Sequence, residues 1–238
     1  MVRTREIQLG TKISESPNRI NTLIIHEHDD VCDSVTGRAM TGSWVWGSAH
    51  VLSHYILTRV ESTSEFSFTL QGKTVLELGA GTGLPGLTAS RLGAHRVILT
   101  DLAPLLPGLR NNVEVNGLDD RVEVCELVWG SDELPSELSE LRLNGVDLVL
   151  MSDVFYDPSL MRFLAKTLKM VCGSETNIWS ASEVRQSTGE CLNELASHGF
   201  KVTEFPSQMS QHSSSELEIS TDEYAIYLIT PPGKWSTH

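Results

Sequence analysis

An apolar run that ends in a cluster of glycines constrains this chain more than any other feature. Residues 75–86 read Val-Leu-Glu-Leu-Gly-Ala-Gly-Thr-Gly-Leu-Pro-Gly. A short apolar run bounded by a glycine-rich turn is typical of a strand buried on both faces of a parallel sheet. Glycines adopt positive φ and let a ligand approach the backbone, and the helix predicted after them presents unpaired N–H groups. The sequence therefore predicts a nucleotide-like ligand at this turn.

The residues around these glycines narrow the choice of ligand. No Gly-Lys-Ser/Thr follows Gly83, which excludes a Walker A loop for ATP or GTP. The G-x-G-x-x-G spacing of dinucleotide sites occurs at 81–86, but it begins two residues after Gly79, and alone it is a weak signal. Glu77 would place a carboxylate beside a pyrophosphate, whereas it suits a cationic ligand. S-adenosylmethionine carries an ammonium and a sulfonium and no phosphate, so we expect it as the cofactor.

The next predicted strand supplies a second test of this interpretation. Residues 96–101 read Arg-Val-Ile-Leu-Thr-Asp, and an acid at the end of this strand, about 20 residues beyond the glycines, holds a ribose in related architectures. Asp101 can accept hydrogen bonds from both ribose hydroxyls. It can also cap the helix predicted near Ala103, and the two roles are compatible.

Further motifs follow the glycine motif at 77–83 in a fixed order. They are Thr100-Asp101, Trp129-Gly130 and Asp153-Val154-Phe155-Tyr156, with Val45-Trp46 upstream. Over roughly residues 42–181 the chain resembles the seven-stranded S-adenosylmethionine methyltransferases, specifically the methyltransferase-like family 16 group of protein-lysine methyltransferases. This resemblance implies an α/β fold with a Rossmann-like class I sheet, mostly parallel with an antiparallel last strand. It also implies methyl transfer to a lysine side chain of a protein.

The pattern of strands and helices agrees with such a fold. A hairpin from 5–9 and 19–26 and a helix at 49–57 form an N-terminal part, 1–60, of the same domain as the core, 61–238. Strands are expected at 74–78, 97–100, 122–127, 146–151, 176–181, 200–205 and 223–229, helices at 84–92, 105–116, 158–171 and 188–198, a short helix around 136–141 and a polar loop at 206–221. This alternation predicts right-handed crossovers, a parallel sheet and a ligand at the carboxyl ends of its strands.

Length and charge limit the partners. The 238 residues fit one α/β domain, and 31 acidic against 18 basic residues give a formal charge of -13. Such a surface repels nucleic-acid phosphates and anionic lipids and favours cationic partners. We expect a protein substrate with a basic or lysine-rich surface, and neither nucleic acid nor a membrane as a partner. That the acidity only keeps the chain soluble stays open as an alternative.

The cysteines and the start of the chain bear on metal binding and location. The four cysteines, Cys32, Cys125, Cys172 and Cys191, form no C-x-x-C pair, so we predict neither a metal site nor a disulfide framework. Residues 1–6 lack the apolar region of a secretory signal, and no apolar run approaches the length of a membrane span. We expect a monomer in the cytoplasm, with the nucleus as a second compartment.

The catalytic residues are expected where the strand at 146–151 ends. Asp153 would orient and desolvate the incoming amine, Tyr156 would form a channel wall and bond to the cofactor or the amine, and Phe155 would add apolar wall. Asp153 is not assigned as a general base, because a partly solvated carboxylate is too weak a base. The alternative for Asp153 is a cap on the helix beginning near Pro158.

The remaining cofactor contacts come from two tryptophans and from the backbone. Trp129 can lie beside adenine, where an indole offers area and stacking. The resemblance implies that Trp46 contacts the cofactor, and we expect it at the methionine end. Core packing stays open for both. The predicted cofactor-binding residues are Trp46, Glu77, Gly79, Ala80, Gly81, Asp101, Trp129 and Ser152.

Three other functions stay open at this stage. Glu183, after the fifth strand, could hold the guanidinium of an arginine substrate. A small-molecule methyltransferase could use the same fold, although the sequence shows no obvious lid. A module that binds S-adenosylmethionine without turnover is the third alternative, against which the intact glycine and Asp-x-x-Tyr motifs argue.

Overall fold

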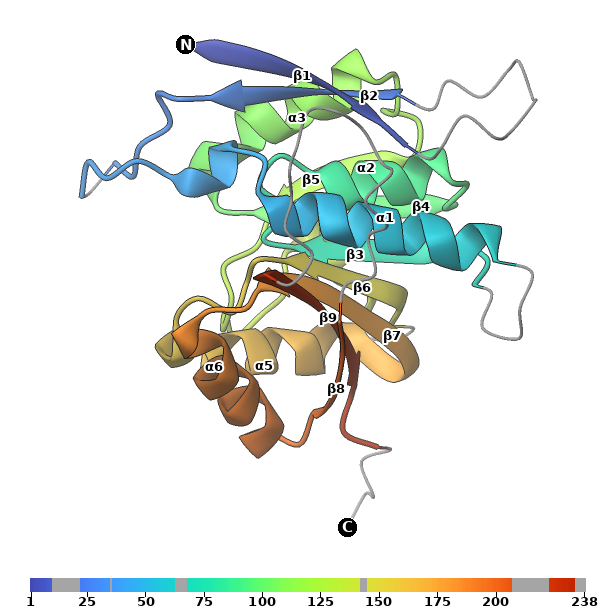
Figure 1. Ribbon diagram of the computed structural model, residues 1–238, viewed down its shortest axis with the longest axis vertical. Coiled ribbons are helices and arrows are strands. Elements are labelled where there is room, and N and C mark those ends of the chain that lie inside the picture. Colours follow the sequence, from blue (N-terminus) through green and yellow to red (C-terminus); the bar gives the residue numbers. More distant parts are fainter. Residues whose placement is uncertain (10–21, 35, 63–67, 142–144, 207–222, 234–238) are drawn as a thin grey trace.

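Strand-forming and helix-forming stretches alternate along the chain, and in the computed structural model they build one sheet covered on both faces (Figure 1). The structure describes residues 1–9, 22–34, 36–62, 68–141, 145–206 and 223–233. The predicted polar loop at 206–221 and the turn of the N-terminal hairpin lie almost entirely outside these ranges. No helix within them is long and apolar enough to cross a bilayer.

The central sheet has seven described strands in the order β5-β4-β3-β6-β7-β9-β8. Their bounds are β3 Thr74–Leu78, β4 Arg96–Asp101, β5 Val122–Glu126, β6 Val146–Ser152, β7 Cys172–Glu183, β8 Lys201–Pro206 and β9 Tyr224–Thr230. Strands β3 to β7 pair in parallel, whereas β9 is antiparallel to both of its neighbours, β7 and β8. The predicted sheet, mostly parallel with an antiparallel last strand, is confirmed.

Helices cover the sheet in two groups. On one face lie α1 (Gly47–Glu61), α2 (Leu84–Arg91) and α3 (Leu106–Val115), and on the other lie α5 (Met161–Val171) and α6 (Gln186–Ser197). Short 3-10 turns are η1 (Thr41–Ser43), η2 (Ala103–Leu105), η3 (Ser136–Leu138) and η4 (Pro158–Leu160). Strand β3 serves both layers, because Val75 joins the core under α1 and α2 while Leu76 and Leu78 join the core under α5 and α6.

Most predicted elements agree with the structure within a few residues, and β3 agrees at both ends. The main difference is β7, which starts four residues earlier than predicted, at Cys172, directly after α5. In the predicted pattern, residues 172–175 belong to neither element. The hydroxyl of Thr176 accepts from Gly173 N (2.8 Å) and donates to Val146 O (2.5 Å), which satisfies backbone groups where the β6–β7 register shifts.

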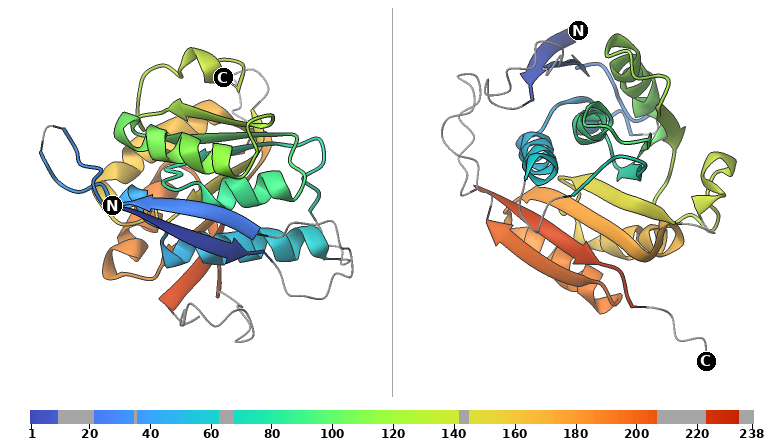
Figure 2. Two further views of the ribbon diagram at one scale, coloured as in Figure 1. Left: turned by 90° about the horizontal axis from the view of Figure 1, so that it is seen from above. Right: turned by 90° about the vertical axis from the view of Figure 1, so that its right-hand side faces the viewer.

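The N-terminal hairpin, β1 (Val2–Gln8) and β2 (Thr22–His28), lies on the outer side of α2 and α3 (Figure 2). Two asparagines hold it there, Asn112 on α3 and Asn116 directly after this helix. Asn116 exchanges hydrogen bonds with Ile24 N and O (2.9 and 2.7 Å), and Asn112 does the same with His26 N and O (2.8 and 3.2 Å). The side-chain amides therefore replace a neighbouring strand along this edge of β2. Asn112 also donates to Thr82 O (3.1 Å), so the hairpin is connected to the glycine-rich turn.

Candidate active site

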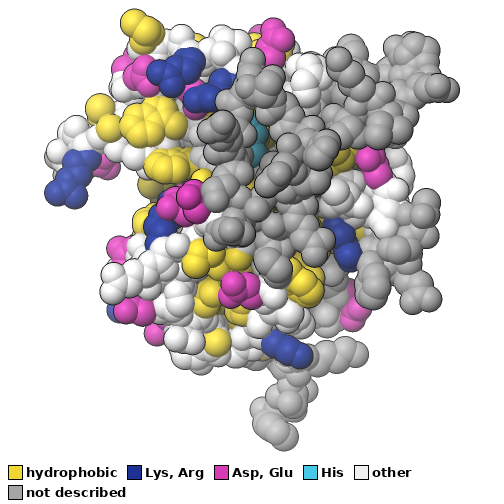
Figure 3. Space-filling view, viewed as in Figure 1, with side chains coloured by type: hydrophobic (Ala, Val, Ile, Leu, Met, Phe, Trp, Pro, Cys, Tyr) yellow, Lys and Arg dark blue, Asp and Glu magenta, His cyan; other side chains and the backbone are white. Residues whose placement is uncertain are grey.

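A cavity of about 640 Å³ opens at the carboxyl ends of β3, β4 and β6, where a parallel sheet of this kind is expected to bind its ligand. Its volume is in the range of small-molecule sites. Figure 3 shows apolar side chains gathered over the segment between β2 and α1, which supplies one wall. Of the predicted site residues, the cavity is lined by Trp46, Gly79, Ala80, Gly81, Asp101, Trp129, Ser152, Asp153 and Tyr156.

The glycine-rich turn presents bare backbone to this cavity. Gly79 and Gly81 have φ of 65° and 57°, a region that side chains with a Cβ rarely adopt. A Cβ on Gly79 would lie 3.1 Å from the Trp129 ring, and one on Gly81 would lie 2.6 Å from Gly42 O. A hydrogen bond from Ala80 N to Thr100 O (2.9 Å) fixes the turn to the end of β4. The turn thus requires glycine at both positions, because a larger residue would collide with neighbouring protein atoms.

Asp101 binds the same turn with its carboxylate. Its Oδ2 accepts from Gly81 N and its Oδ1 accepts from Leu102 N, each at 2.7 Å. Burial raises the pKa of Asp101, and these two backbone hydrogen bonds act in the opposite direction. The alternative that Asp101 caps the following helix is not what the structure shows, because η2 has no side-chain cap. Each carboxylate oxygen keeps a further lone pair for a ligand hydroxyl.

Glu77 lies beneath the turn and does not line the cavity. Its side chain is fully buried, its Oε2 accepts from Gly86 N (2.9 Å) in the first turn of α2, and its Oε1 has no hydrogen-bond partner. Burial, with a smaller contribution from the charge of Asp101, raises the pKa of Glu77 to about 8. The structure therefore gives Glu77 a role in holding the start of α2, and its contact with a cofactor stays a prediction.

The two tryptophans lie at the cavity wall. Trp46 is 37% exposed, and its indole N–H donates to Thr41 O (3.0 Å) just before α1 begins. Trp129 packs at the edge of the core under α5, with its ring against Gly79. Both rings are available to a ligand.

Asp153 follows the last residue of β6 in an unusual conformation. Its φ of 56° is the only positive value for a non-glycine residue in the described ranges, and such strain is found most often at functional sites. The carboxylate receives two hydrogen bonds from one guanidinium, with Arg185 Nη1 2.8 Å from Oδ1 and Nη2 2.9 Å from Oδ2. Asp153 does not cap the following helix. That role belongs to Asp157, whose Oδ1 accepts from Ser159 N (2.9 Å).

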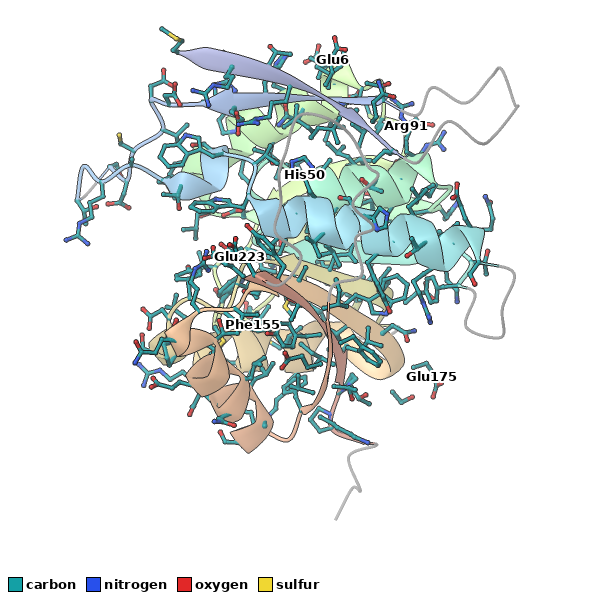
Figure 4. All side chains as sticks on the ribbon, in the orientation of Figure 1. Glu6, His50, Arg91, Phe155, Glu175 and Glu223 are labelled. Carbon is teal, nitrogen blue, oxygen red and sulfur yellow. The ribbon has the colours of Figure 1, made fainter. Side chains whose placement is uncertain are left out.

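The aromatic residues that follow Asp153 separate in the structure. Tyr156 is 53% exposed and lines the cavity, as expected. Phe155 is fully buried and packs edge-on against Tyr227, with ring centroids 5.5 Å apart, on the side of the sheet that α5 and α6 cover (Figure 4). The expected apolar wall from Phe155 is therefore corrected: the chain turns this ring into the core as it leaves β6.

Arg185 is the residue that the sequence interpretation missed. It lies between the end of β7 and the start of α6, and besides Asp153 it binds Glu183 (Nη2 to Oε2, 2.8 Å). The parallel register of β6 and β7, with Ser152 opposite Ala181, brings these residues together. The available signal was a charged Glu-Val-Arg directly after an apolar strand, of which only Glu183 was considered. Other lining residues not singled out are Thr41, Gly42, Trp44, Leu105, Val128 and Phe163.

Known structures share the fold at low sequence identity. Mitomycin 7-O-methyltransferase MmcR matches with a TM-score of 0.55 and 15% identity, over 77% of this chain and 54% of that one. The [4+2]-cyclase SpnF matches with a TM-score of 0.54 and 15% identity, over 81% and 85%. These matches establish the class I methyltransferase fold and no particular reaction.

Sequence comparisons are more specific. EEF1A lysine methyltransferase 3 of Xenopus tropicalis is 36% identical over 61% of this chain, which spans 59% of that protein's length. Protein N-lysine methyltransferase METTL21A of Danio rerio is 35% identical over 71% of this chain and 73% of its own. Histone-arginine methyltransferase METTL23 of Mus musculus is 30% identical over 76% and 68%. A family model described as "Lysine methyltransferase" matches residues 27–197. The chain belongs to this lysine methyltransferase family.

Proposed function

We propose that this chain transfers a methyl group from S-adenosylmethionine to the side-chain amine of a lysine in a protein substrate. The observation that carries the proposal is that one cavity is lined at once by the glycine-rich turn, Asp101, both tryptophans, Asp153 and Tyr156. We assign the glycine-rich turn, Asp101 and Trp129 to a cofactor half of the cavity, and Asp153 and Tyr156 to an acceptor half.

The residues present fit S-adenosylmethionine. Gly79 and Gly81 line the cavity with backbone alone, and Asp101 offers the free lone pairs that ribose hydroxyls require. Trp129 supplies an aromatic face for adenine. Glu77 does not line the cavity, and it supports this site through its hydrogen bond to Gly86 N at the start of α2. The bound cofactor supplies an electrophilic methyl group on a positively charged sulfur.

The protein's own contribution is to position and desolvate the acceptor amine. We place the amine beside Asp153 and Tyr156, which both line the cavity, and Trp46 and Tyr156 contribute partly exposed rings to its wall. A lysine must lose its proton before it can attack, because only a neutral nitrogen has a free lone pair. Both oxygens of Asp153 are engaged by Arg185, so this carboxylate orients the amine and is not its proton acceptor. Alignment of the reacting atoms is the main source of rate.

The charge of the chain guides the choice of substrate. A formal charge of -13 favours a basic surface around the target lysine, which we propose as the substrate class. An arginine acceptor is the second candidate, because the mouse relative that matches over 76% of this chain carries the name histone-arginine methyltransferase.

Incubation with methyl-labelled S-adenosylmethionine and a size-fractionated cell extract tests the proposal. We expect label in a protein band and, after hydrolysis, in methyllysine. Label in methylarginine would establish the second candidate. Label only in a small-molecule fraction, or cofactor binding without any transfer, would refute the proposed activity.

A further inference from the structure

A three-membered ion cluster lies at the end of the cavity that we assign to the acceptor, where Asp153 and Arg185 line the cavity and Glu183 does not. The Arg185 guanidinium donates to both oxygens of Asp153 (2.8 and 2.9 Å) and also to Glu183 (2.8 Å). The side chains of Asp153 and Arg185 are only 13% and 27% exposed. Hydrogen bonding to Asp153 raises the pKa of Arg185, so the guanidinium is charged at every pH at which the protein is studied. The cluster carries two negative charges and one positive charge.

The backbone fixes both ends of this cluster. Asp153 N donates to Ala181 O (2.9 Å), which ties the strained residue to β7. Arg185 precedes the first residue of α6, and its N donates to Thr188 Oγ1 (2.9 Å). A bidentate pair with both partners anchored in this way is more persistent than a surface ion pair.

Arg185 is the only basic side chain among the described residues that line the cavity, whereas Asp101 and Asp153 are both acidic. The other titratable groups near the cluster are carboxyl, phenol and thiol groups, none of which carries a positive charge. They come from β4, from the segment after β6, from β9 and the residue before it, and from α6, and they are Asp101, Tyr156, Asp157, Glu223, Tyr224 and Cys191. No second cation in this group could replace Arg185.

This arrangement determines what a lysine meets when it enters. Two carboxylates without a counter-ion would bind the ammonium form and raise the pKa of the amine, which opposes methyl transfer. A guanidinium held between them offsets that effect. We propose that Arg185 is the internal counter-ion of the acceptor site, a positioning residue that holds Asp153 and keeps the acceptor lysine in its neutral, reactive form. The inference rests on the proposed function. Because Arg185 occupies both carboxylates, no empty carboxylate pair is left for a substrate guanidinium.

Two substitutions at Arg185 and one control variant distinguish the effect of the guanidinium charge from that of side-chain packing. Arg185→Gln removes the charge, and Arg185→Lys keeps the charge without the bidentate geometry. The control is Arg96→Gln, since Arg96 makes a bidentate pair with Glu123 (2.7 and 2.8 Å) on β4 and β5 and does not line the cavity. Melting curves of all variants establish that they are folded.

The first measurement is the pH profile of single-turnover lysine methylation. In Arg185→Gln we expect the rise of the methylation rate with pH to move up by about one pH unit. The rate should then be about tenfold lower than that of the wild type near neutrality and equal to it at high pH. Arg185→Lys should recover most of this loss, and Arg96→Gln should keep the wild-type profile. Glu183→Gln, which removes one negative charge, should move the limb to lower pH. A purely structural role would not produce shifts of opposite sign.

The second measurement does not depend on activity. Calorimetry compares the affinity for S-adenosylmethionine, a cation, with that for S-adenosylhomocysteine, which lacks the sulfonium charge. Because Arg185 lines the same cavity, Arg185→Gln should raise the preference for the sulfonium several-fold, and Arg96→Gln should leave it unchanged.

Specific outcomes would overturn the inference. They are a loss in Arg185→Gln that is equal at all pH values, an Arg185→Lys variant as impaired as Arg185→Gln, or an unchanged ratio of the two affinities. If Arg185→Gln does not fold, the pH profile of Glu183→Gln tests the inference alone. A profile that does not move to lower pH would then overturn it. A wild-type chain that binds cofactor but methylates no lysine refutes the proposed function, and the affinity ratio then still tests the counter-ion. Absence of binding to either ligand refutes both.

Discussion

Asp101 ends β4 and Asp153 follows β6, the two strands that flank β3, yet different partners hold their carboxylates. Asp101 accepts from two backbone amides, Gly81 N and Leu102 N. Asp153 accepts from a side chain, the guanidinium of Arg185, and more distantly from the Ser182 hydroxyl (3.4 Å). The first carboxylate therefore depends on the path of the main chain, and the second depends on a single residue that substitution can remove.

The difference separates the two halves of the cavity by how they are built. In the proposed cofactor half, main-chain groups of the glycine-rich turn make the contacts: Ala80 N donates to Thr100 O, Gly81 N donates to Asp101, and Thr82 O accepts from the Asn112 amide. This half is preorganised, and substitutions can change its charge only slightly because main-chain groups are the same in every residue. The acceptor half is an ion cluster whose net charge is set by side chains, which makes it the part in which substrate preference can be adjusted.

The largest effect is expected from Asp153→Asn. Asparagine is nearly isosteric and tolerates the left-handed conformation, so the backbone is retained while the charge beside the amine is lost. We expect methyl transfer to fall about a hundredfold or more, with cofactor affinity changed only a few-fold, because the lost interaction is made chiefly in the transition state. Single-turnover rates and calorimetry measure the two quantities. Asp157→Asn, at the residue that caps η4, is the matched control. Near-normal transfer in Asp153→Asn would remove Asp153 from the active site.

Asp101→Ala should show the opposite pattern. A lost hydrogen bond to a charged group costs about 1.5–3 kcal/mol, so cofactor affinity should fall roughly ten- to a hundredfold. The rate at saturating cofactor should change much less. Asp101→Asn, which can still accept one of the two backbone bonds, should lie between the variant and the wild type. Unchanged affinity in a folded Asp101→Ala protein would mean that the ribose is held elsewhere.

Trp129→Ala tests whether the cofactor half also depends on a side chain. Loss of a stacked base should cost roughly 1–3 kcal/mol of cofactor affinity. Trp179 is the control, because it is buried between Tyr55 and Phe68 at centroid distances of 5.3 and 4.8 Å. Trp179→Ala should lower the melting temperature and leave the affinity of the folded protein unchanged. If Trp129→Ala behaves in the same way, Trp129 is a core residue only.

Glu77→Gln tests a third carboxylate. Glu77 accepts one hydrogen bond from the backbone, whereas Asp101 accepts two and Asp153 has a counter-ion. With a pKa of about 8 in the folded state against 4.5 as the reference value, Glu77 keeps a proton that the unfolded chain releases between these pH values. Stability of the cofactor-free protein should therefore fall as pH rises through this window, by at most about 1.4 kcal/mol per pH unit. Urea unfolding at several pH values should show a shallower slope in Glu77→Gln. Identical slopes would show that Glu77 does not titrate in this range.

Much of the cofactor half could be predicted because its signals are local. A buried strand, three glycines and an acid at the end of the next strand are each recognised within a few residues, and β3 and Asp101 lie where the sequence places them. Phe155 could not be placed in this way. Adjacent aromatic residues after a strand give no indication of which ring turns toward the core and which toward the cavity, and here the strained Asp153 precedes that division.

What the sequence by itself determined is the order of strands and helices, the glycine-rich turn and the position of the acids, since these depend on local periodicity and backbone preference. What only the tertiary structure decided is which side chains meet across the sheet. Arg185 and Asp153 are 32 residues apart, and Asn116 and Ile24 are 92 apart. Their contacts exist because parallel strands align their carboxyl ends and because α3 lies against β2, and neither relation is visible in the spacing of residues along the chain.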